Sequence, residues 1–215
     1  MKTRFLVVDT ETTGLKPPIG VAEIAWCELE EDLNIVSEFS SLVNPMIPIE
    51  PGASAVNAIT DDLVADAPKI HELPWPSEPV VLICHNTAFD RPLVEPFLDI
   101  VDEICTLRLA RRLLPDAESH KLSVLNAYCE LEPSLAHRAL LDTRMTIGLL
   151  DYMAEGSGMG MVELIEWLKK PVKFKRLPFG KFKGTPVDRV PYSYLRWMKS
   201  LPDLDDDMRA TLSHI

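Results

Sequence analysis

The sequence predicts an α/β or α+β layer fold built on a mixed sheet, and three observations support this prediction. Apolar, β-rich segments come first along the chain, and segments with helical periodicity follow them. The apolar and charged fractions, 47% and 26%, are those of a globular protein, which excludes disordered and collagen-like chains. No apolar run approaches the roughly 18 residues that a membrane-spanning helix needs, so no contact with a membrane is expected.

The first half of the chain supplies the expected strands. Residues 4–10 contain a run that is apolar on both faces, which is typical of a central strand. Residues 20–30 and 34–43 carry β-branched and aromatic residues between turn signals, which predicts two neighbouring strands. A further apolar run at 80–84 predicts a fourth, buried strand.

Loops and helices account for the rest of the first 154 residues. Prolines between residues 45 and 51 indicate one loop, and a second Pro-rich loop covers 68–79. Thr60 is a suitable N-cap for a short helix. Apolar residues at helical spacing predict the longer helices. The expected helices cover residues 61–65, about 88–98, 106–113, 121–131 and 137–154.

The chain is expected to divide into three parts. The segment from Glu155 to Gly160 is rich in glycine, which disfavours regular structure and makes it the best candidate for a linker. A short helix is expected at about 161–169, and a basic segment begins at Pro171. The expected parts are a domain at 1–154, a linker with a short helix at 155–170, and a small module at 171–215.

The charge of the chain is strongly polarised. The net charge of −11 by itself argues against a nucleic-acid partner. Residues 169–199, however, hold ten Lys or Arg against one acid, Asp188, so this segment carries +9 and the rest of the chain −20. The sequence therefore predicts an acidic body with a basic arm or subdomain.

The cysteines and the N-terminus indicate the compartment. The apolar run before Asp9 is too short for the core of a signal peptide and is followed by no cleavage site. Four cysteines lie far apart in apolar segments, which favours reduced core thiols over disulfides or a zinc site. We therefore expect a cytoplasmic protein. The cysteines are Cys27, Cys84, Cys105 and Cys129.

Four acids stand at positions that a fold normally fills with apolar residues. Asp9 closes the first strand and Glu11 follows two residues later, so both carboxylates point to the same face. Asp90 and Asp142 each have apolar residues three and seven positions later, which places them on the buried side of a helix. Each acid alone would ordinarily be a capping or solvated residue, but their recurrence calls for a shared counter-charge.

A divalent cation is the counter-charge that the sequence favours. No lysines are placed as the acids are, so a cation is a better partner than four separate ion pairs. Oxygen ligands without cysteines or clustered histidines favour Mg²⁺ or Mn²⁺ over zinc. The acids therefore predict a magnesium or manganese site.

Three segments resemble the motifs of a known family. Residues 8–15 (VDTETTGL), 85–90 (HNTAFD) and 137–142 (HRALLD) resemble, in order and spacing, the three motifs of the DnaQ-like, or DEDDh, 3′→5′ exonucleases. The histidine form is indicated because Arg138 stands where the tyrosine form has Tyr. The resemblance covers about residues 4–153 and implies an RNase H-like α/β fold. That fold has a mixed five-stranded sheet flanked by helices, here followed by a small C-terminal α+β module.

The resemblance also implies a two-metal mechanism. Two Mg²⁺ ions, for which Mn²⁺ can substitute, would stabilise the attacking hydroxide and the leaving 3′-oxygen. Asp9 would bridge both ions, while Glu11 and Asp142 would hold the ion that carries the nucleophilic water. Asp90 would support the second ion, and His137 would be the general base, since its ordinary pKa near 6.5 suits proton removal at neutral pH.

Substrate contacts follow from the same resemblance. The backbone of Thr10 would meet the terminal 3′-hydroxyl, and Leu15, beyond Gly14, would press on the last base. Asn86 would orient the second-motif loop or touch a phosphate. Phe89 would pack near the base, although core packing is an equal reading of this residue.

One segment departs from the family pattern. Residues 57–60 are Asn-Ala-Ile-Thr, where many members carry His-Gly-Ile-Thr. A nucleotide-facing contact is expected to be lost there, and no metal ligand is affected. No role is assigned to His85.

The C-terminal segment interleaves cations with aromatic residues. Its aromatics are expected to form the core of a tiny β-hairpin with a following helix, while its lysines stay exposed and meet DNA phosphates. No P-loop is present. The cations expected to hold the substrate backbone are Lys173, Lys175, Arg176, Lys181 and Lys183.

The sequence thus predicts a Mg²⁺-dependent 3′→5′ exodeoxyribonuclease that releases 5′-mononucleotides from single- or double-stranded DNA. An exoribonuclease of the same superfamily is one alternative, since recognition of the 2′-hydroxyl is not set by these motifs. A proofreading subunit docked on a polymerase, or another partner of DNA repair, is a second. A metal-free nucleic-acid-binding module is a third, which Mg²⁺-dependent product release would exclude. The oligomeric state is left open.

Overall fold

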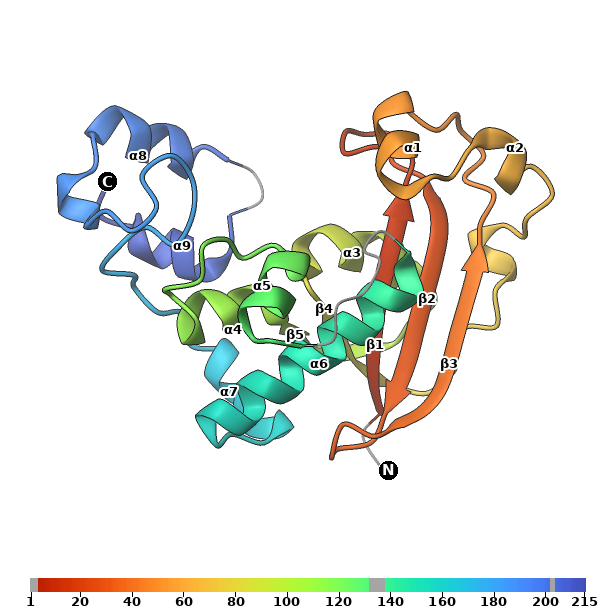
Figure 1. Ribbon diagram of the computed structural model, residues 1–215, viewed down its shortest axis with the longest axis horizontal. Helices are drawn as coiled ribbons and strands as arrows, with labels where there is room; N and C mark the ends of the chain where they lie inside the picture. Colours follow the sequence, from red (N-terminus) through yellow and green to blue (C-terminus); the bar gives the residue numbers. More distant parts are fainter. Residues whose placement is uncertain (1–3, 132–137, 202–203) are drawn as a thin grey trace.

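A computed structural model describes residues 4–131, 138–201 and 204–215, and within them one mixed five-stranded sheet organises the chain (Figure 1). The strand order is β3-β2-β1-β4-β5. β1 pairs antiparallel with β2, as β2 does with β3, whereas the β1–β4 and β4–β5 pairs are parallel. The predicted mixed sheet and RNase H-like fold are confirmed. The strands are β1 (Arg4–Thr12), β2 (Val21–Leu29), β3 (Ile35–Leu42), β4 (Val80–Cys84) and β5 (Ile100–Cys105).

The sheet is buried on both faces at its centre. Phe5 and Val7 of β1 point into one core, while Leu6 and Val8 point into the other, as the alternation of a strand requires. The first core is covered by α6 (Ala139–Ser157), which packs on β1 and β2, and by α4 (Thr106–Leu113) and α5 (Leu122–Tyr128), which pack on α6. This double burial explains why the sequence of β1 is apolar without alternation.

The second core ends in a row of stacked aromatic rings. Trp26 of β2 stacks on Phe39 at 4.0 Å and on Trp75 at 5.1 Å between ring centroids, and Trp75 stacks on Phe97 at 5.1 Å. The row fastens the edge strand β3 and the Pro-rich segment around Trp75 to the sheet.

Several elements differ from the prediction. Strand β5 has no clear apolar run, because its half-exposed middle carries Asp102 and Glu103. Helix α1 (Pro51–Asn57) lies where a loop was expected, with Pro51 at its first helical position, where proline is tolerated. The helix expected at 88–98 is shorter, since α3 (Thr87–Val94) gives way to the 3₁₀ turn η2 (Glu95–Phe97) at Pro96. The remaining elements of this part are α2 (Asp61–Val64) and η1 (Ile70–Glu72).

The glycine-rich segment is mostly structured. Helix α6 continues to Ser157 and ends at Gly158, which has the left-handed backbone typical of a helix C-terminus, so the expectation of irregular structure from Glu155 is wrong. Gly160 then caps α7 (Met161–Leu168), whose buried residues belong to the first core. The connection between α6 and α7 is therefore a tight turn.

Residues after 170 form a small module with its own core. Its buried residues include Leu177, Leu195 and Met208, and its elements are η3 (Val187–Arg189), α8 (Tyr192–Lys199) and α9 (Asp206–Thr211). The expected hairpin is a single antiparallel bridge between Arg176 and Pro186. Prolines explain this, because they remove backbone donors that a longer ladder would need.

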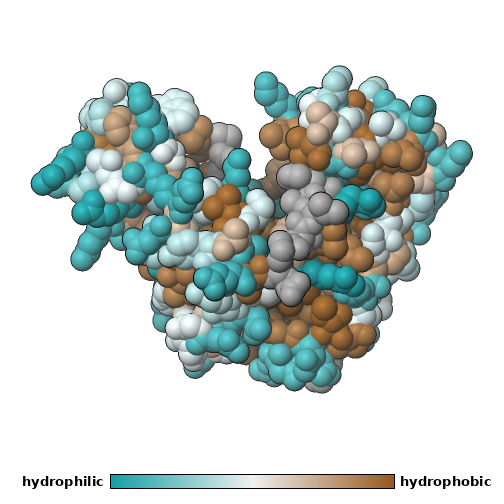
Figure 2. Space-filling view, in the orientation of Figure 1, coloured by the Kyte–Doolittle hydropathy of each residue, from teal (hydrophilic) through white to brown (hydrophobic). Residues whose placement is uncertain are grey.

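The module is held against α4 by a cluster of buried ion pairs. Asp207, which is fully buried, accepts hydrogen bonds from Arg112 (2.6 and 2.7 Å), Arg108 (3.1 Å) and the backbone of Val172 (3.0 Å). Arg111 pairs with Asp205 and lies over the ring of Phe179 at 4.1 Å. Figures 1 and 2 show that the module and the α1–α2 region stand on opposite sides of a hollow in the molecule.

Candidate active site

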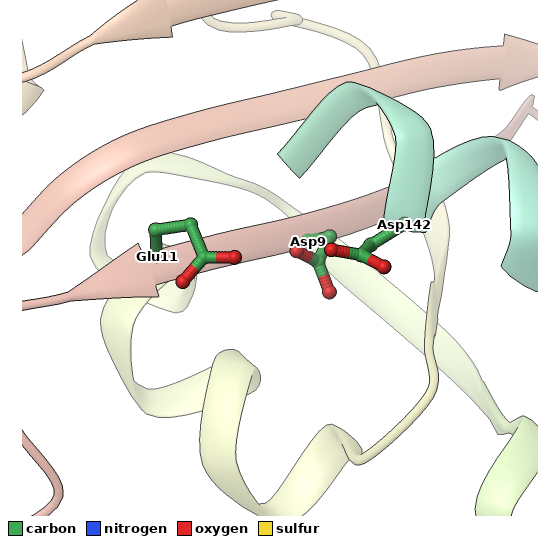
Figure 3. Close-up of side chains that lie close together, drawn as sticks. All are labelled: Asp9, Glu11 and Asp142. Atoms are coloured by element: carbon green, nitrogen blue, oxygen red, sulfur yellow. The ribbon is translucent and has the colours of Figure 1, made fainter. Parts of the chain in front are cut away.

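Three acids from two elements meet beside the middle of the sheet. Asp9 and Glu11 lie two residues apart on β1 and face the same side, and Asp142 comes from the first turn of α6 (Figure 3). One carboxylate oxygen from each of the three lies within 4.8 Å of the others. This spacing fits shared coordination of a divalent cation by hard oxygen ligands.

Local structure explains how Asp142 reaches β1. Helix α6 packs across β1 and β2, and the backbone N–H of Asp142 donates to the carbonyl of Arg138 at 3.0 Å. Ala139 and Met145, three residues before and after Asp142, are buried in the same helix. The acid therefore lies on the covered side of α6, as its apolar spacing predicts.

Asp90, the fourth expected acid, is buried in α3 next to this cluster. Its carboxylate accepts a 2.7 Å hydrogen bond from the hydroxyl of Thr10, the residue between Asp9 and Glu11. Burial raises the pKa of Asp90 to about 7, although the hydrogen bonds from Thr10 oppose this shift. Asp90 is not part of the 4.8 Å group, but of the neighbouring acids it acts most strongly on the pKa of Asp9.

The crowding of acids perturbs their protonation. Burial, and then the charges of Asp90 and Asp142, raise the pKa of Asp9 well above its ordinary value. Burial and the charge of Asp142 raise the pKa of Glu11 to about 7, while a hydrogen bond from Asn57 opposes the shift. Such a cluster is unfavourable as a set of bare anions, and a bound cation offsets both burial and repulsion.

A pocket of about 520 Å³ opens beside Glu11. Leu15 is one of its lining residues, with 80% of its surface exposed. A Cβ atom on Gly14 would lie 2.6 Å from Cδ of Glu50, so glycine lets the chain pass under that side chain. The pocket is lined by Glu11, Thr12, Gly14, Leu15, Lys16, Glu50, Gly52, Ala53, Val56 and Asn57.

The other expected residues of the first and second motifs come from β1 and from the beginning of α3. Asn86 is exposed immediately before α3, and Phe89 is half-buried in its first turn. Thr10 is buried, and its side chain is engaged with Asp90. His137, the expected general base, lies outside the described residues.

Two polar residues of the site region were not identified from the sequence. His85 is half-buried and joins two segments: its Nε2 donates to the carbonyl of His120 at 2.9 Å, and its Nδ1 accepts from the hydroxyl of Thr106 at 3.0 Å. Burial lowers the pKa of His85 to about 4, which keeps the ring neutral. Glu23 of β2 is 2% exposed and lies opposite Glu11 in the sheet. An acid flanked by apolar residues in a predicted strand was the available signal for Glu23.

Two of the five expected DNA-contacting cations donate hydrogen bonds to backbone carbonyls of the protein. Lys183 is half-buried, and its Nζ donates to the backbone carbonyls of Ala117 and Glu118. The guanidinium of Arg176 donates to the carbonyl of Gly184 at 2.8 Å. The sequence-based expectation that the lysines of the module stay exposed is therefore wrong for Lys183.

The other three expected cations lie on the surface of the module. Lys173 Nζ contacts His214 Nε2 at 2.6 Å, and Lys181 Nζ lies 5.7 Å from the ring centre of Phe182. Lys175 is exposed in the segment before α8. All three residues are exposed.

Comparison with known proteins defines the class of the chain. Residues 6–150 match the family model described as Exonuclease. Exodeoxyribonuclease 10 of Escherichia coli strain K12 is 33% identical over 217 aligned positions, which cover 97% of this chain and 96% of that protein. The chain is thus a nuclease of the exonuclease family. It belongs to the DnaQ-like group, and the prediction from its three motifs is confirmed.

Other proteins resemble all or part of the chain. A solved structure of exonuclease X in complex with 5′-overhanging duplex DNA is 34% identical, with a TM-score of 0.63, and covers 75% of this chain and 98% of its own. DNA polymerase III PolC-type of Oceanobacillus iheyensis is 31% identical over 159 positions, which are 68% of this chain but 11% of the polymerase. Residues 165–202 match a second family model, described as a candidate quorum-sensing-regulated virulence factor.

Proposed function

We propose that the protein is a Mg²⁺-dependent 3′→5′ exodeoxyribonuclease that releases 5′-mononucleotides from the 3′ ends of DNA. The observation that carries the proposal is the meeting of Asp9, Glu11 and Asp142 within 4.8 Å in a chain of the exonuclease family. That family is divalent-metal dependent. Similarity to Exodeoxyribonuclease 10 along 97% of the chain supports DNA as the substrate.

The group of Asp9, Glu11 and Asp142 fits a divalent ion. In the proposed two-metal mechanism these three acids and the neighbouring Asp90 would together hold both ions. When bound, the ions supply a nucleophilic hydroxide and stabilise the leaving 3′-oxygen. In this proposal His137 takes the proton from the attacking water, and Thr10 keeps Asp90 in place through its 2.7 Å hydrogen bond.

The pocket beside Glu11 is the proposed site of the terminal nucleotide. Leu15 would press on the last base from its exposed position, and Phe89 would pack near it. Asn86, exposed before α3, would meet the phosphate backbone.

The C-terminal module is proposed to bind the DNA strand outside this pocket. Lys173, Lys175 and Lys181 offer surface charge, whereas Lys183 and Arg176 are already bonded to backbone carbonyls. Trp197 of α8 is 53% exposed, so its ring is open to stacking by a base. We propose an exonuclease domain that continues past residue 154 to the end of α6 and a module at 171–215, joined by α7, whose buried residues belong to the first core.

The surroundings of the protein are proposed on separate grounds. None of the described helices is long and apolar enough to cross a membrane. Four buried, free cysteines fit a reducing cytoplasm. The PolC-type polymerase that shares part of this sequence makes a polymerase or another repair protein the partner to test by co-purification.

The test is digestion of end-labelled DNA by a pair of variants on one helix. Asp142→Asn removes a proposed metal ligand, and the exposed Asp151 of α6 supplies the matched control Asp151→Asn. We expect Asp142→Asn to abolish Mg²⁺-dependent cleavage and Asp151→Asn to leave it unchanged. Single-stranded DNA, duplex DNA and RNA are compared, and preferential cleavage of RNA would replace the proposal with its exoribonuclease alternative.

A further inference from the structure

A fifth carboxylate lies beside the four acids, and the proposed mechanism does not use it. Glu23 of β2 faces Glu11 across the antiparallel β1–β2 pair and is 2% exposed. Its charge contributes to the raised pKa of both Asp9 and Glu11. A buried acid that adds negative charge to a crowded site is unfavourable unless an ion pair or hydrogen bonds compensate its charge.

The partner is the beginning of α6. The guanidinium of Arg138 donates to Glu23 through Nη2 at 2.9 Å and through Nε at 3.2 and 3.3 Å to the two carboxylate oxygens. The backbone N–H of Ala139, the first residue of α6, donates to Oε2 of Glu23 at 3.2 Å. Both oxygens of one buried carboxylate thus bind two consecutive residues of the helix start.

This arrangement caps α6 from another element. Arg138 occupies the N-cap position and provides no side-chain cap of its own. The first N–H groups of a helix need acceptors and favour a negative charge nearby, and Glu23 supplies both from the sheet. The turn it fixes carries Asp142, whose N–H donates to the carbonyl of Arg138 at 3.0 Å.

We infer that Glu23 is a positioning residue: through Arg138 and the N–H of Ala139 it fixes the first turn of α6, so that Asp142 meets Asp9 and Glu11 in a geometry that binds divalent metal. The inference rests on the proposed metal site. It assigns Glu23 no contact with metal or DNA. Groups that orient metal ligands in this way are typically worth about 10- to 100-fold in metal affinity.

The chain contains a matched control for this clamp. Arg144, also on α6, donates to Glu38 of β3 at 2.6 and 2.9 Å, so it joins the same helix to the same sheet. That pair is exposed, with half of the Arg144 side chain open to solvent, and it does not engage the N–H groups of the first turn. Removing this pair tests whether the loss of any ion pair between α6 and the sheet weakens metal binding.

The experiment uses double variants of the full chain that keep its net charge. Glu23→Ala/Arg138→Ala deletes the clamp, Glu23→Gln/Arg138→Gln keeps an acceptor for Ala139, and Glu38→Ala/Arg144→Ala is the control. Hydrogen exchange reports on the first turn of α6, and Mn²⁺ binding without DNA is followed by electron paramagnetic resonance. Cleavage of single-stranded DNA then gives kcat and KM as functions of Mg²⁺ concentration.

We expect the alanine pair at 23 and 138 to speed exchange in the first turn of α6 and to weaken Mn²⁺ binding about tenfold. Its kcat falls at limiting Mg²⁺ while KM for DNA stays within about twofold of the wild-type value. The glutamine pair recovers most of the loss, and the control pair matches the wild type.

Two results would separate the possible failures. If the alanine pair at 23 and 138 binds Mn²⁺ as tightly as the control pair, or if both pairs weaken it equally, Glu23 does not position the site. If the wild-type protein itself binds no Mn²⁺, the proposed metal site fails, and the inference fails with it. Should the alanine pair not fold, Arg138→Ala alone, at a side chain that is 60% exposed, is compared with Arg144→Ala in the same measurements, and equal Mn²⁺ binding by these two variants contradicts the inference.

Discussion

The clustered acids of the site lower the free energy of unfolding of the metal-free protein at neutral and higher pH. The folded-state pKa of Glu11 is about 7, whereas the ordinary value is 4.5. Between these values the folded protein binds more protons than the unfolded chain, so Glu11 has little effect on the free energy of unfolding below pH 4.5 and lowers it progressively as the pH rises from 4.5 to 7. The effect is largest where Glu11 is ionised in both states.

Replacing Glu11 with Gln should therefore stabilise the metal-free protein in a pH-dependent way. We expect a gain on the order of 1–2 kcal/mol at pH 8, reduced for the solvent that reaches this half-buried carboxyl, and little gain at pH 4.5. Thermal unfolding of both proteins in EDTA measures the difference, which also cancels the opposing titration of His85. A gain that is equal at both pH values would contradict this account.

A second residue-scale effect lies at the end of α1. Ala58 has a left-handed backbone (φ 59°), a conformation that favours glycine. A Cβ atom makes this conformation unfavourable by about 1 kcal/mol. Ala58→Gly should raise the free energy of unfolding by roughly 0.5–1 kcal/mol in urea titrations, because relief of strain exceeds the entropy added to the unfolded chain. A loss of stability would show that Ala58 is not strained.

Site residues could be predicted from the sequence where they follow the two-residue repeat of a strand or the 3.6-residue repeat of a helix. Asp9 and Glu11 share a face because strands alternate, and Asp142 lies on the apolar side of its helix. Glu23 could not be assigned, because its role depends on β1–β2 register and on where α6 begins. The hydrogen bonds of His85 likewise join segments 21 and 35 residues away, which no local pattern reveals.

At the scale of elements, the ion-pair cluster between α4 and α9 fixes the module. Burial alone would raise the pKa of Asp207, but hydrogen bonds from Arg112 and Val172 and the charge of Arg108 lower it overall. The side chains of Arg112 and Asp207 are 2% and 1% exposed. Removing one partner leaves a buried charge uncompensated.

Asp207→Ala should consequently destabilise the protein by about 3–5 kcal/mol and release the module from α4. Urea unfolding and limited proteolysis measure the two effects. The neighbouring Asp206, which is exposed at the start of α9, gives the control Asp206→Ala. Equal behaviour of the two variants would mean that the cluster does not hold the module.

Element types were largely predictable, whereas several boundaries were not. The apolar runs of β1 and β4 and the spacing of α6 are strong signals. Strand β5 was missed because two acids occupy its middle, and α1 was missed because Pro51 and Gly52 suggested a loop. The glycines after 155 predict a linker, but Gly158 instead ends a long helix.

At the scale of the whole molecule, the basic segment contains two lysines whose surroundings differ. Lys181 is exposed beside an aromatic ring, whereas Lys183 is bonded to the carbonyls of Ala117 and Glu118. If the module binds DNA, Lys181→Ala should reduce the slope of log Kd against log salt by about 0.7, the worth of one single-strand phosphate contact. Lys183→Ala should leave that slope unchanged. The slopes come from titrations of labelled single-stranded DNA at several salt concentrations, and equal slopes for Lys181→Ala and wild type would contradict the prediction.

The bond from Lys183 also joins the tail to the catalytic half of the chain. The carbonyls that it binds, those of Ala117 and Glu118, lie two to three residues before His120. The carbonyl of His120 accepts the hydrogen bond from Nε2 of His85. His85 follows β4 and stands five residues before Asp90. Lys183 thus connects the C-terminal module to the segment that hydrogen-bonds His85, and we expect Lys183→Ala to speed hydrogen exchange around His85 and Asp90 while the free energy of unfolding changes little.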